Sequence, residues 1–285
     1  MNRTCIILNP AAKSERARGF KEKVRHLAPG VTIKFTECPG DAEAQAERAV
    51  EQGYRTIVAA GGDGTINEVV NGLDGADVTL GILPIGSVNV FSMELGIPNK
   101  IEKAWQVILD GKTREVDLAS ANDHRFVQLA GVGLDAQIVE RTEWESKKLL
   151  GPLSYILTGA QMMAEKPPRI VVTPEEGKPR VGSFVLIGNG RFYGGPFPIF
   201  KEAVLDDGLL DICLFEQMSP FAMARYIQAI LTGSHLKLKD VHYFKSRRVR
   251  VEADEKVPME VDGELLGYLP CEFSVKRGGL RVLVP

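Results

Sequence analysis

The stretch 57–73 changes character twice, and this order constrains the fold more than any other feature of the chain. An apolar run over 57–60 precedes Gly61, Gly62 and Gly64, and apolar residues then recur at 66, 69, 70 and 73. The apolar run is typical of a buried strand, and the later spacing is that of a helix with one buried face. The glycines therefore lie between a strand and a helix N-terminus. There, positive φ angles and free backbone N–H groups favour a bound phosphate.

Asp63 lies among these glycines, where its charge opposes a polyphosphate. A cation between the two, or a chemical role for the carboxylate, removes the conflict. Mg²⁺ bound to ATP meets the first condition. The alternative is an ordinary turn in which Asp63 or Thr65 caps the helix, as isolated Asp-Gly pairs commonly do.

The composition narrows the class of protein only broadly. The 285 residues are 44% hydrophobic and 25% charged, as in ordinary globular proteins. The net charge of −2 gives no general attraction to nucleic acid, so we expect no nucleic-acid partner. No apolar stretch approaches the roughly 20 residues of a membrane span, which favours a cytoplasmic protein. Neither a zinc site nor a disulfide framework is indicated by the four scattered cysteines, Cys5, Cys38, Cys213 and Cys271.

The first half alternates strand and helix patterns, which predicts a parallel sheet with helical crossovers. The strands are expected over 6–8, 31–35, 57–60 and 79–84. Ligands of such sheets bind at the carboxyl ends of the strands. The loops that follow these four strands carry Asn9, Thr36, Asp63 and the pair Gly86-Ser87. We therefore expect these residues to meet at one site.

The pattern changes after about residue 121, where short strand-like runs predominate and predict an antiparallel β-sandwich. The expected strands are 126–130, 170–173, 183–187, 210–215, 248–252, 257–261, 272–276 and 280–284, with helical segments at 134–143, 152–165 and 219–232. We expect an α/β domain over 1–121 and a β-rich domain over 122–285, and the last strand is free to return to the first domain.

The residues 61–73 read Gly-Gly-Asp-Gly-Thr-Ile-Asn-Glu-Val-Val-Asn-Gly-Leu. This string resembles the signature of the diacylglycerol kinase catalytic domain family, bacterial lipid kinases related to sphingosine and ceramide kinases. Its core also occurs in NAD kinases, and a similar one in phosphofructokinases of the same superfamily. Further family-like motifs follow in the expected order at 131–136, 188–195, 205–211 and 261–264. The resemblance implies a nucleotide-binding domain like that of these kinases, a C-terminal sandwich, and ATP-dependent phosphorylation of a lipid.

The resemblance also implies a nucleotide site. Asn9 and Thr36 would contact the nucleotide, with Lys13, Arg16 or Arg18 near its phosphates. The loop 84–91 departs from the family pattern at two positions: Ser87 replaces a threonine and keeps the hydroxyl, and Val90 replaces an aspartate. The remaining expected nucleotide-binding residues are Gly61, Gly62, Gly64, Thr65, Gly86, Ser87, Asn89 and Glu264.

Phosphoryl transfer also requires a group that accepts the proton of the attacking hydroxyl. By the resemblance, Asp262 is the first choice for this base and Asp63 the rival. Glu264 would contact Mg²⁺ or the nucleotide, and Asp117 and Asp206 would belong to a Mg²⁺ network. From the residues alone, Asp262 and the glycine after it are typical of a hairpin turn.

The implied acceptor is diacylglycerol or a related lipid, as in phospholipid biosynthesis. The segment 144–155 mixes aromatic residues, leucines and lysines as interfacial segments do, and 192–193 and 197–200 are candidates for the acyl-chain entry. We therefore expect transient, peripheral contact with a membrane surface. An NAD kinase-like activity and a non-catalytic lipid- or nucleotide-binding regulator remain as alternatives, and a homodimer formed through an exposed strand is left open.

Overall fold

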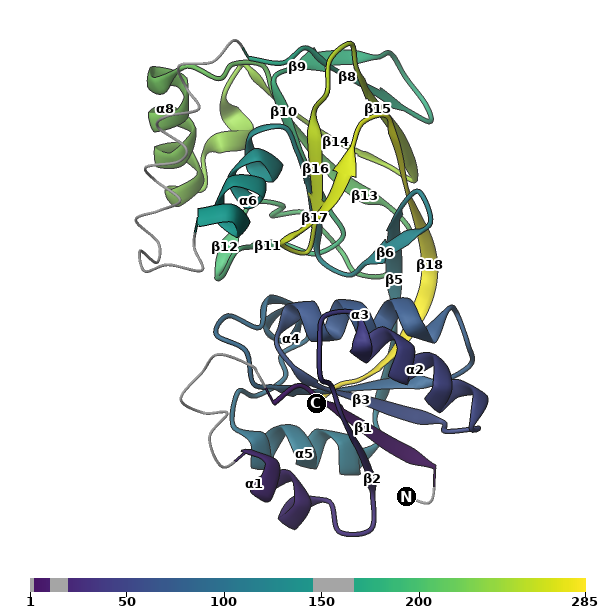
Figure 1. Ribbon diagram of the computed structural model, residues 1–285. Helices are drawn as coiled ribbons and strands as arrows, with labels where there is room; N and C mark the ends of the chain where they lie inside the picture. Colours follow the sequence, from purple (N-terminus) through teal and green to yellow (C-terminus); the bar gives the residue numbers. More distant parts are fainter. Residues whose placement is uncertain (1–2, 11–19, 146–166) are drawn as a thin grey trace.

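The computed structural model describes residues 3–10, 20–145 and 167–285, which form two layered halves (Figure 1). Three of our sequence-based interpretations lie outside these residues. They are the cations Lys13, Arg16 and Arg18, the helix over 152–165, and most of the segment 144–155.

The N-terminal half contains a parallel sheet in the order β2-β1-β3-β4. The strands are β1 (Thr4–Leu8), β2 (Thr32–Phe35), β3 (Thr56–Gly61) and β4 (Thr79–Pro84). Helices α2 and α3 cover one face of this sheet, and α1 and α5 cover the other (Figure 1). The helices are α1 (Phe20–Leu27), α2 (Asp41–Glu51), α3 (Asp63–Leu73), α4 (Val90–Glu94) and α5 (Ile101–Asp110). The predicted parallel sheet is confirmed.

Small residues let helices α2 and α3 pack closely. Ala42, Ala46 and Ala49 form the buried face of α2. A side chain on Gly72 of α3 would place its Cβ 2.3 Å from the carbonyl oxygen of Glu43. Residue 72 must therefore be glycine for these helices to approach each other as they do, which fixes the position of α3 above the sheet.

The C-terminal half is an antiparallel sandwich, as expected. One of its sheets has the order β14-β13-β10-β7-β16-β17, and the other contains β6, β5, β18, β15, β8 and β9. The first sheet consists of β7 (Leu129–Val132), β10 (Phe184–Gly188), β13 (Leu210–Phe215), β14 (Val241–Ser246), β16 (Pro258–Val261) and β17 (Glu264–Tyr268). The second adds β5 (Thr113–Ala121), β6 (His124–Phe126), β8 (Ile170–Pro174), β9 (Arg180–Gly182), β15 (Arg248–Ala253) and β18 (Cys271–Leu283). Between the sheets lies an apolar core in which Phe126 and Phe273 meet edge to face.

The strand β18 runs through both halves of the molecule (Figure 1). It pairs antiparallel with β5 and β15 in the sandwich, and its end pairs parallel with β4, where Val282 faces Leu80. We expected separate strands at 272–276 and 280–284. They form one strand, with a register irregularity between Lys276 and Leu280. Continuous backbone pairing therefore couples the two halves.

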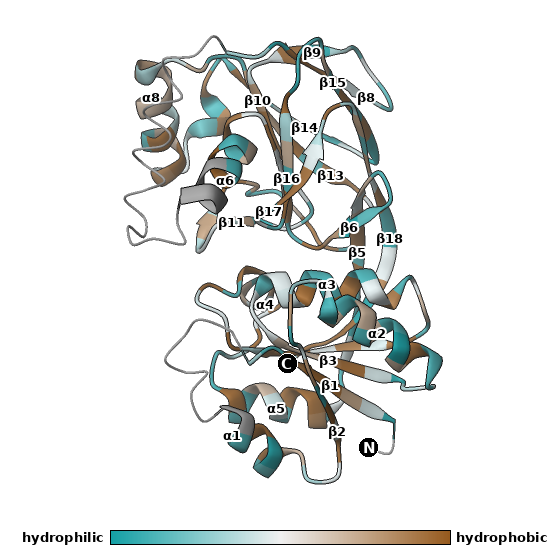
Figure 2. Ribbon diagram, viewed as in Figure 1, coloured by the Kyte–Doolittle hydropathy of each residue, from teal (hydrophilic) through white to brown (hydrophobic). Residues whose placement is uncertain are grey.

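Shorter elements complete the sandwich half. They are α6 (Leu134–Glu145), α8 (Pro220–Leu231), the short helix His235–Lys237 and the hairpin of β11 (Phe192–Tyr193) and β12 (Phe197–Pro198). Hydrophobic residues concentrate on the inner strands, while the outer face of α2 is hydrophilic (Figure 2). Within the described residues, no helix is both long and apolar enough to cross a membrane.

Candidate active site

The glycine loop joins β3 to α3, as the sequence predicted, but its glycines are needed for a different reason. None of Gly61, Gly62 and Gly64 has a positive φ angle. Instead, a Cβ on Gly61 would lie 2.3 Å from the side chain of Thr65, and a Cβ on Gly86 would lie 2.5 Å from the Cα of Gly62. The loop therefore requires glycine because the Thr65 side chain and the backbone of Gly86 approach it closely, not because of its φ angles.

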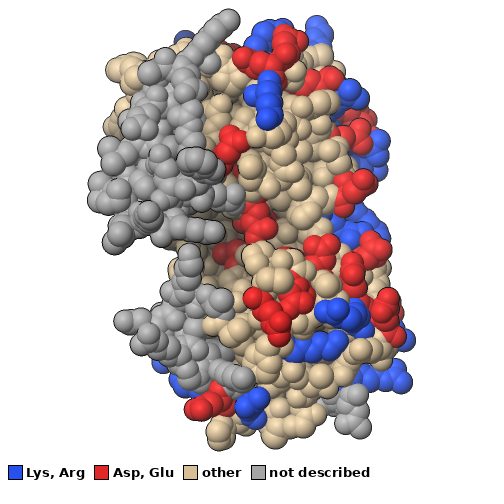
Figure 3. All heavy atoms as spheres, viewed as in Figure 1, with Lys and Arg blue, Asp and Glu red and all other residues tan. Residues whose placement is uncertain are grey.

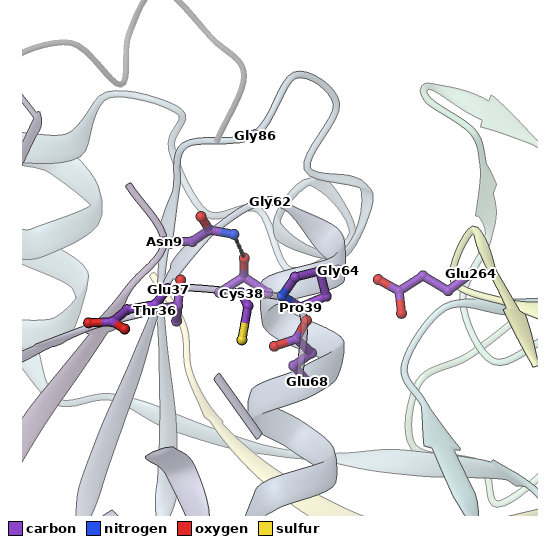
Figure 4. A pocket seen from close by; sticks show the side chains of 11 residues that line it. Asn9, Thr36, Glu37, Cys38, Pro39, Gly62, Gly64, Glu68, Gly86 and Glu264 are labelled. Atoms are coloured by element: carbon purple, nitrogen blue, oxygen red, sulfur yellow. Dashed lines mark hydrogen bonds between the residues drawn. The ribbon is translucent and has the colours of Figure 1, made fainter. Parts of the chain in front are cut away.

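A cavity of about 580 Å³ opens at the carboxyl ends of the parallel strands (Figure 4). Its lining residues come from the loops after β1, β2, β3 and β4, from the start of α3 and from the first residue of β17. The side-chain amide of Asn9 donates a 3.1 Å hydrogen bond to the hydroxyl of Thr65 across this cavity. The lining residues are Asn9, Thr36, Glu37, Cys38, Pro39, Gly62, Gly64, Thr65, Glu68, Gly86 and Glu264.

Glu264 is the residue of the sandwich half that reaches this cavity. It is exposed, it begins β17, and its side chain points toward Gly64 (Figure 4). A Cβ on Gly64 would lie 2.7 Å from Glu264 Oε1. Gly64 belongs to the first turn of α3, where unpaired N–H groups carry partial positive charge. A carboxylate from one half thus faces the positive end of a helix in the other.

Asp63 does not line the cavity but contacts the next helix. Its Oδ1 accepts a 3.3 Å hydrogen bond from the backbone N–H of Phe91, in the first turn of α4. Burial raises the pKa of Asp63, and hydrogen bonds from the backbone of Val90, Phe91 and Asn89 oppose this rise. Val90, which replaces the family's aspartate, is the first residue of α4. Asp63 is therefore neither a cap for its own helix nor, in this arrangement, a group facing the cavity.

Asn89 and Ser87 also lie away from the cavity lining. Asn89 is buried with φ 58°, and its amide donates a 2.9 Å hydrogen bond to the carbonyl oxygen of Gly86. Ser87 is exposed. Asn89 thus shapes the loop that holds Gly86 against the glycine loop, while Gly86 itself lines the cavity.

The carboxylate of Asp262 is saturated with hydrogen bonds. Its Oδ1 accepts from the backbone N–H groups of Gln128 and Leu129, both at 3.0 Å. Its Oδ2 accepts from the backbone N–H of Val127 and the amide of Asn67, both at 2.9 Å. Burial raises the pKa of Asp262, and these four donors oppose the rise because they stabilise the ionised form.

Asp262 and Gly263 also form the hairpin turn between β16 and β17. Their φ angles of 47° and 88° are left-handed, as a two-residue hairpin requires, and Val261 pairs with Glu264 across the turn. The turn interpretation of this Asp-Gly pair is therefore confirmed. The turn places Glu264 at the cavity, two residues beyond a carboxylate that is fixed in position.

Two residues of α3 that we assigned no role connect the halves. The Asn67 amide bonds both Asp262 and the carbonyl oxygen of Arg125. Asn71 accepts a 2.9 Å hydrogen bond from the backbone N–H of Arg125 and donates one to its carbonyl oxygen. The signal available in the sequence was two asparagines four residues apart among the apolar residues of this helix, because buried amides need defined partners.

Asp117 and Asp206 lie near β18 rather than at the cavity. Asp117 is 1% exposed and accepts hydrogen bonds from the backbone N–H groups of Gly208 (2.6 Å) and Gly278 (2.9 Å). Burial raises its pKa. The carboxylate of Asp206 forms a 2.7 Å ion pair with Arg114. Across residues 3–10, 20–145 and 167–285, no three acidic, histidine or cysteine side chains are grouped so that they could hold a metal ion.

Comparison with known proteins agrees with the fold. Residues 3–121 match the diacylglycerol kinase catalytic domain, and residues 128–284 match the YegS C-terminal NAD kinase beta sandwich-like domain. A diacylglycerol kinase of Bacillus subtilis (strain 168) is 32% identical over 294 residues, which cover 100% of this chain and 97% of that protein. One of Staphylococcus aureus (strain MRSA252) is 32% identical over 298 residues, covering 99% of this chain and 92% of that protein.

A solved structure extends the likeness to three dimensions. The crystal structure of a diacylglycerol kinase from Bacillus anthracis str. Sterne superposes with a TM-score of 0.79 at 25% identity, over 99% of this chain and 97% of that one. The match to the diacylglycerol kinase catalytic domain, together with full-length relatives named diacylglycerol kinase, shows that the chain is a lipid kinase. The chain belongs to the diacylglycerol kinase family, as the resemblance in its sequence predicted.

Proposed function

We propose that this protein transfers the γ-phosphate of ATP to the hydroxyl of diacylglycerol or a closely related lipid. The observation that carries the proposal is the position of Glu264, which the sandwich half presents to the glycine loop of the nucleotide half. Phosphoryl transfer depends on positioning and charge stabilisation, and it needs an acceptor for the proton of the attacking hydroxyl. One cavity brings these requirements together.

The triphosphate binds, in this proposal, along the glycine loop. The first turn of α3 offers backbone N–H groups, and Thr65 is oriented by the amide of Asn9. Among the described lining residues, three are glutamates (Glu37, Glu68 and Glu264) and none is a lysine or arginine. Acidic side chains also gather near the junction of the halves on the face shown in Figure 3. A polyphosphate therefore needs a cation in this setting.

Magnesium suits this set of oxygen donors, since it is bound through one or two carboxylates, phosphate oxygens and waters. When bound, Mg²⁺ supplies neutralising charge between the phosphates and the glutamates. Glu68 is positioned by a 3.0 Å hydrogen bond that its Oε2 accepts from the backbone N–H of Ala42. We assign Glu68 to this cation, in place of Asp117 and Asp206.

Glu264 is better suited than Asp262 to accept the proton of the lipid hydroxyl. Each oxygen of Asp262 already accepts two hydrogen bonds, so no lone pair remains directed at a substrate. Glu264 is exposed at the cavity instead. In this mechanism Asp262 holds the hairpin, Asp63 holds α4 against the glycine loop, and Glu264 takes the proton.

The acyl chains of the substrate fit the apolar rim between the halves. Val88 and Phe197 are 43% and 44% exposed, and both lie within 3.8 Å of the Cβ position of Gly195. Val88 comes from the loop after β4 and Phe197 from β12, so this rim spans the two halves beside the loop that carries Gly86. A substrate held in a bilayer also implies transient contact of the protein with the membrane surface.

The test is transfer of radiolabelled γ-phosphate from Mg-ATP to diacylglycerol, other lipid alcohols and NAD, each presented separately. We expect label in diacylglycerol or a close analogue, and loss of transfer when Mg²⁺ is chelated. Label only in NAD would replace the proposal with an NAD kinase-like activity. Nucleotide binding without label in any acceptor would replace it with a regulatory role.

A further inference from the structure

Two buried carboxyl groups meet beneath the hairpin that carries Glu264. Glu260, in β16, is 1% exposed, and it pairs across the sheet with Gly131 of β7. Asp135 lies in the first turn of α6. A Cβ on Gly131 would lie 2.2 Å from Asp135 Oδ2 and 2.6 Å from Glu260 Oε1. The two carboxyl groups thus occupy the space that any side chain at residue 131 would fill.

Only one negative charge is favourable at this pair. Burial raises the pKa of both groups, and the charge of Asp135 raises that of Glu260 further. The Tyr193 hydroxyl donates a hydrogen bond to Asp135 Oδ1, and the nearby Asp262 carboxylate adds negative charge beside Glu260. Glu260 Oε1 is buried and accepts no hydrogen bond. A proton on this oxygen, donated to Asp135, satisfies both groups.

The other oxygen of Glu260 holds the hairpin turn. Glu260 Oε2 accepts a 2.7 Å hydrogen bond from the backbone N–H of Gly263, which lies between Asp262 and Glu264. The side chain of Glu260 therefore bridges from α6 to the residue directly before the proposed base. A second ionised carboxylate at this pair would be repelled by Asp135 and would pull on the same turn.

We propose that Asp135 and Glu260 are positioning residues: they share one proton, and the protonated pair holds the 260–263 turn so that Glu264 stands opposite Gly64. This inference deepens the proposed function and rests on it for the activity measurement alone. Neither group touches the cavity; both act through Gly263.

The variant Glu260→Gln keeps a hydrogen-bond donor at residue 260 but cannot become negatively charged. Its amide donates to Asp135 and still accepts from Gly263, so we expect turnover within a fewfold of the wild type. We also expect turnover to persist at alkaline pH, where the wild-type pair ionises and loses activity. Glu260→Ala removes both contacts, and we expect kcat to fall about 100-fold, the scale of a roughly 1 Å misplacement, with little change in KM for ATP. Glu272→Gln, a surface carboxylate paired with Arg248, is the matched control.

A measurement that needs no kinase activity completes the test. Infrared difference spectra of wild type minus Glu260→Gln at neutral pH should show the carbonyl stretch of a protonated carboxylic acid. Absence of that band, wild-type turnover in Glu260→Ala, or equal losses in the Gln and Ala variants would each overturn the inference. If the wild type phosphorylates no lipid, the proposed function fails, and the infrared band still decides whether the proton is shared.

Discussion

The amide of Asn67 donates a 2.9 Å hydrogen bond to the carboxylate of Asp262, across 195 residues of sequence. Asn67 lies one turn into the helix whose first turn contains Gly64, and Asp262 lies two residues before Glu264. This hydrogen bond therefore joins the helix on one side of the cavity to the hairpin on the other. The proposed site therefore depends on contacts between residues that do not line the cavity.

Asp262 is predicted to stabilise the folded protein. Asp262→Ala leaves three backbone N–H groups without acceptors, and each such buried group costs about 1–3 kcal/mol. Asp262→Asn directs an amide N–H at these donors, so it too should lower the free energy of unfolding, by about 1–3 kcal/mol. Urea denaturation measures both, with the exposed Asp254→Asn as the control. Unchanged stability in both variants would contradict the assignment.

Glu264, in contrast, is predicted to matter for turnover and not for stability. It is exposed, so Glu264→Gln should leave the urea midpoint unchanged. Removing the proton acceptor should lower kcat by about 10²–10⁴. Steady-state kinetics on a lipid substrate checks this, with Glu272→Gln as the matched surface control. Turnover near the wild-type value would exclude Glu264 as the base.

The sequence predicted the parts of the structure that depend on local patterns. The strand, glycine loop and helix over 57–73 form as expected, because the hydrophobic periodicity of adjacent residues determines them. The alternation of elements likewise led to the parallel sheet, and Asn9, Thr36 and Gly86 meet at its edge. These residues come together because every parallel strand ends on the same side.

The roles of individual carboxylates could not be predicted in the same way. Whether an aspartate faces a cavity or instead accepts hydrogen bonds from backbone N–H groups depends on residues far away in sequence. The partners of Asp262 lie 133 to 195 residues away, and that of Asp63 is 28 residues away. A family signature predicts which residue occupies a position. The direction of its side chain depends on tertiary packing. For this reason our proposal gives the role of the base to Glu264, and Asp262 holds the hairpin turn instead.

Replacing Gly86 by alanine is predicted to lower stability, whereas replacing Gly64 by alanine is predicted to lower kcat. Gly86→Ala brings a Cβ within 2.5 Å of the Gly62 backbone, which cannot move aside easily, so the protein should lose about 1–3 kcal/mol of stability. Gly64→Ala meets only the carboxylate end of Glu264 at 2.7 Å. That flexible side chain can shift, so stability should persist while kcat falls. Thermal denaturation and kinetics together distinguish the two, and a strongly destabilised Gly64→Ala would contradict this account.

The raised pKa of Asp63 predicts a pH dependence of stability. An acid whose pKa is higher in the folded than in the unfolded protein binds its proton more tightly when folded. Its contribution to the free energy of unfolding is therefore largest at acidic pH, and falls as the pH rises from the ordinary aspartate pKa through the raised value. Asp63→Asn has no proton to lose, and its side-chain oxygen can still accept the hydrogen bond from Phe91. We expect this variant to equal or exceed the wild type in stability at neutral pH.

The slope of stability against pH is the decisive measurement for this residue. Urea denaturation of both proteins between acidic and neutral pH should show a free-energy difference that moves in favour of Asp63→Asn as the pH rises. A constant difference would mean that the pKa of Asp63 is not raised. A difference that moves in favour of the wild type would mean that the backbone donors of Asn89, Val90 and Phe91 outweigh burial, and that the ionised carboxylate itself stabilises α4.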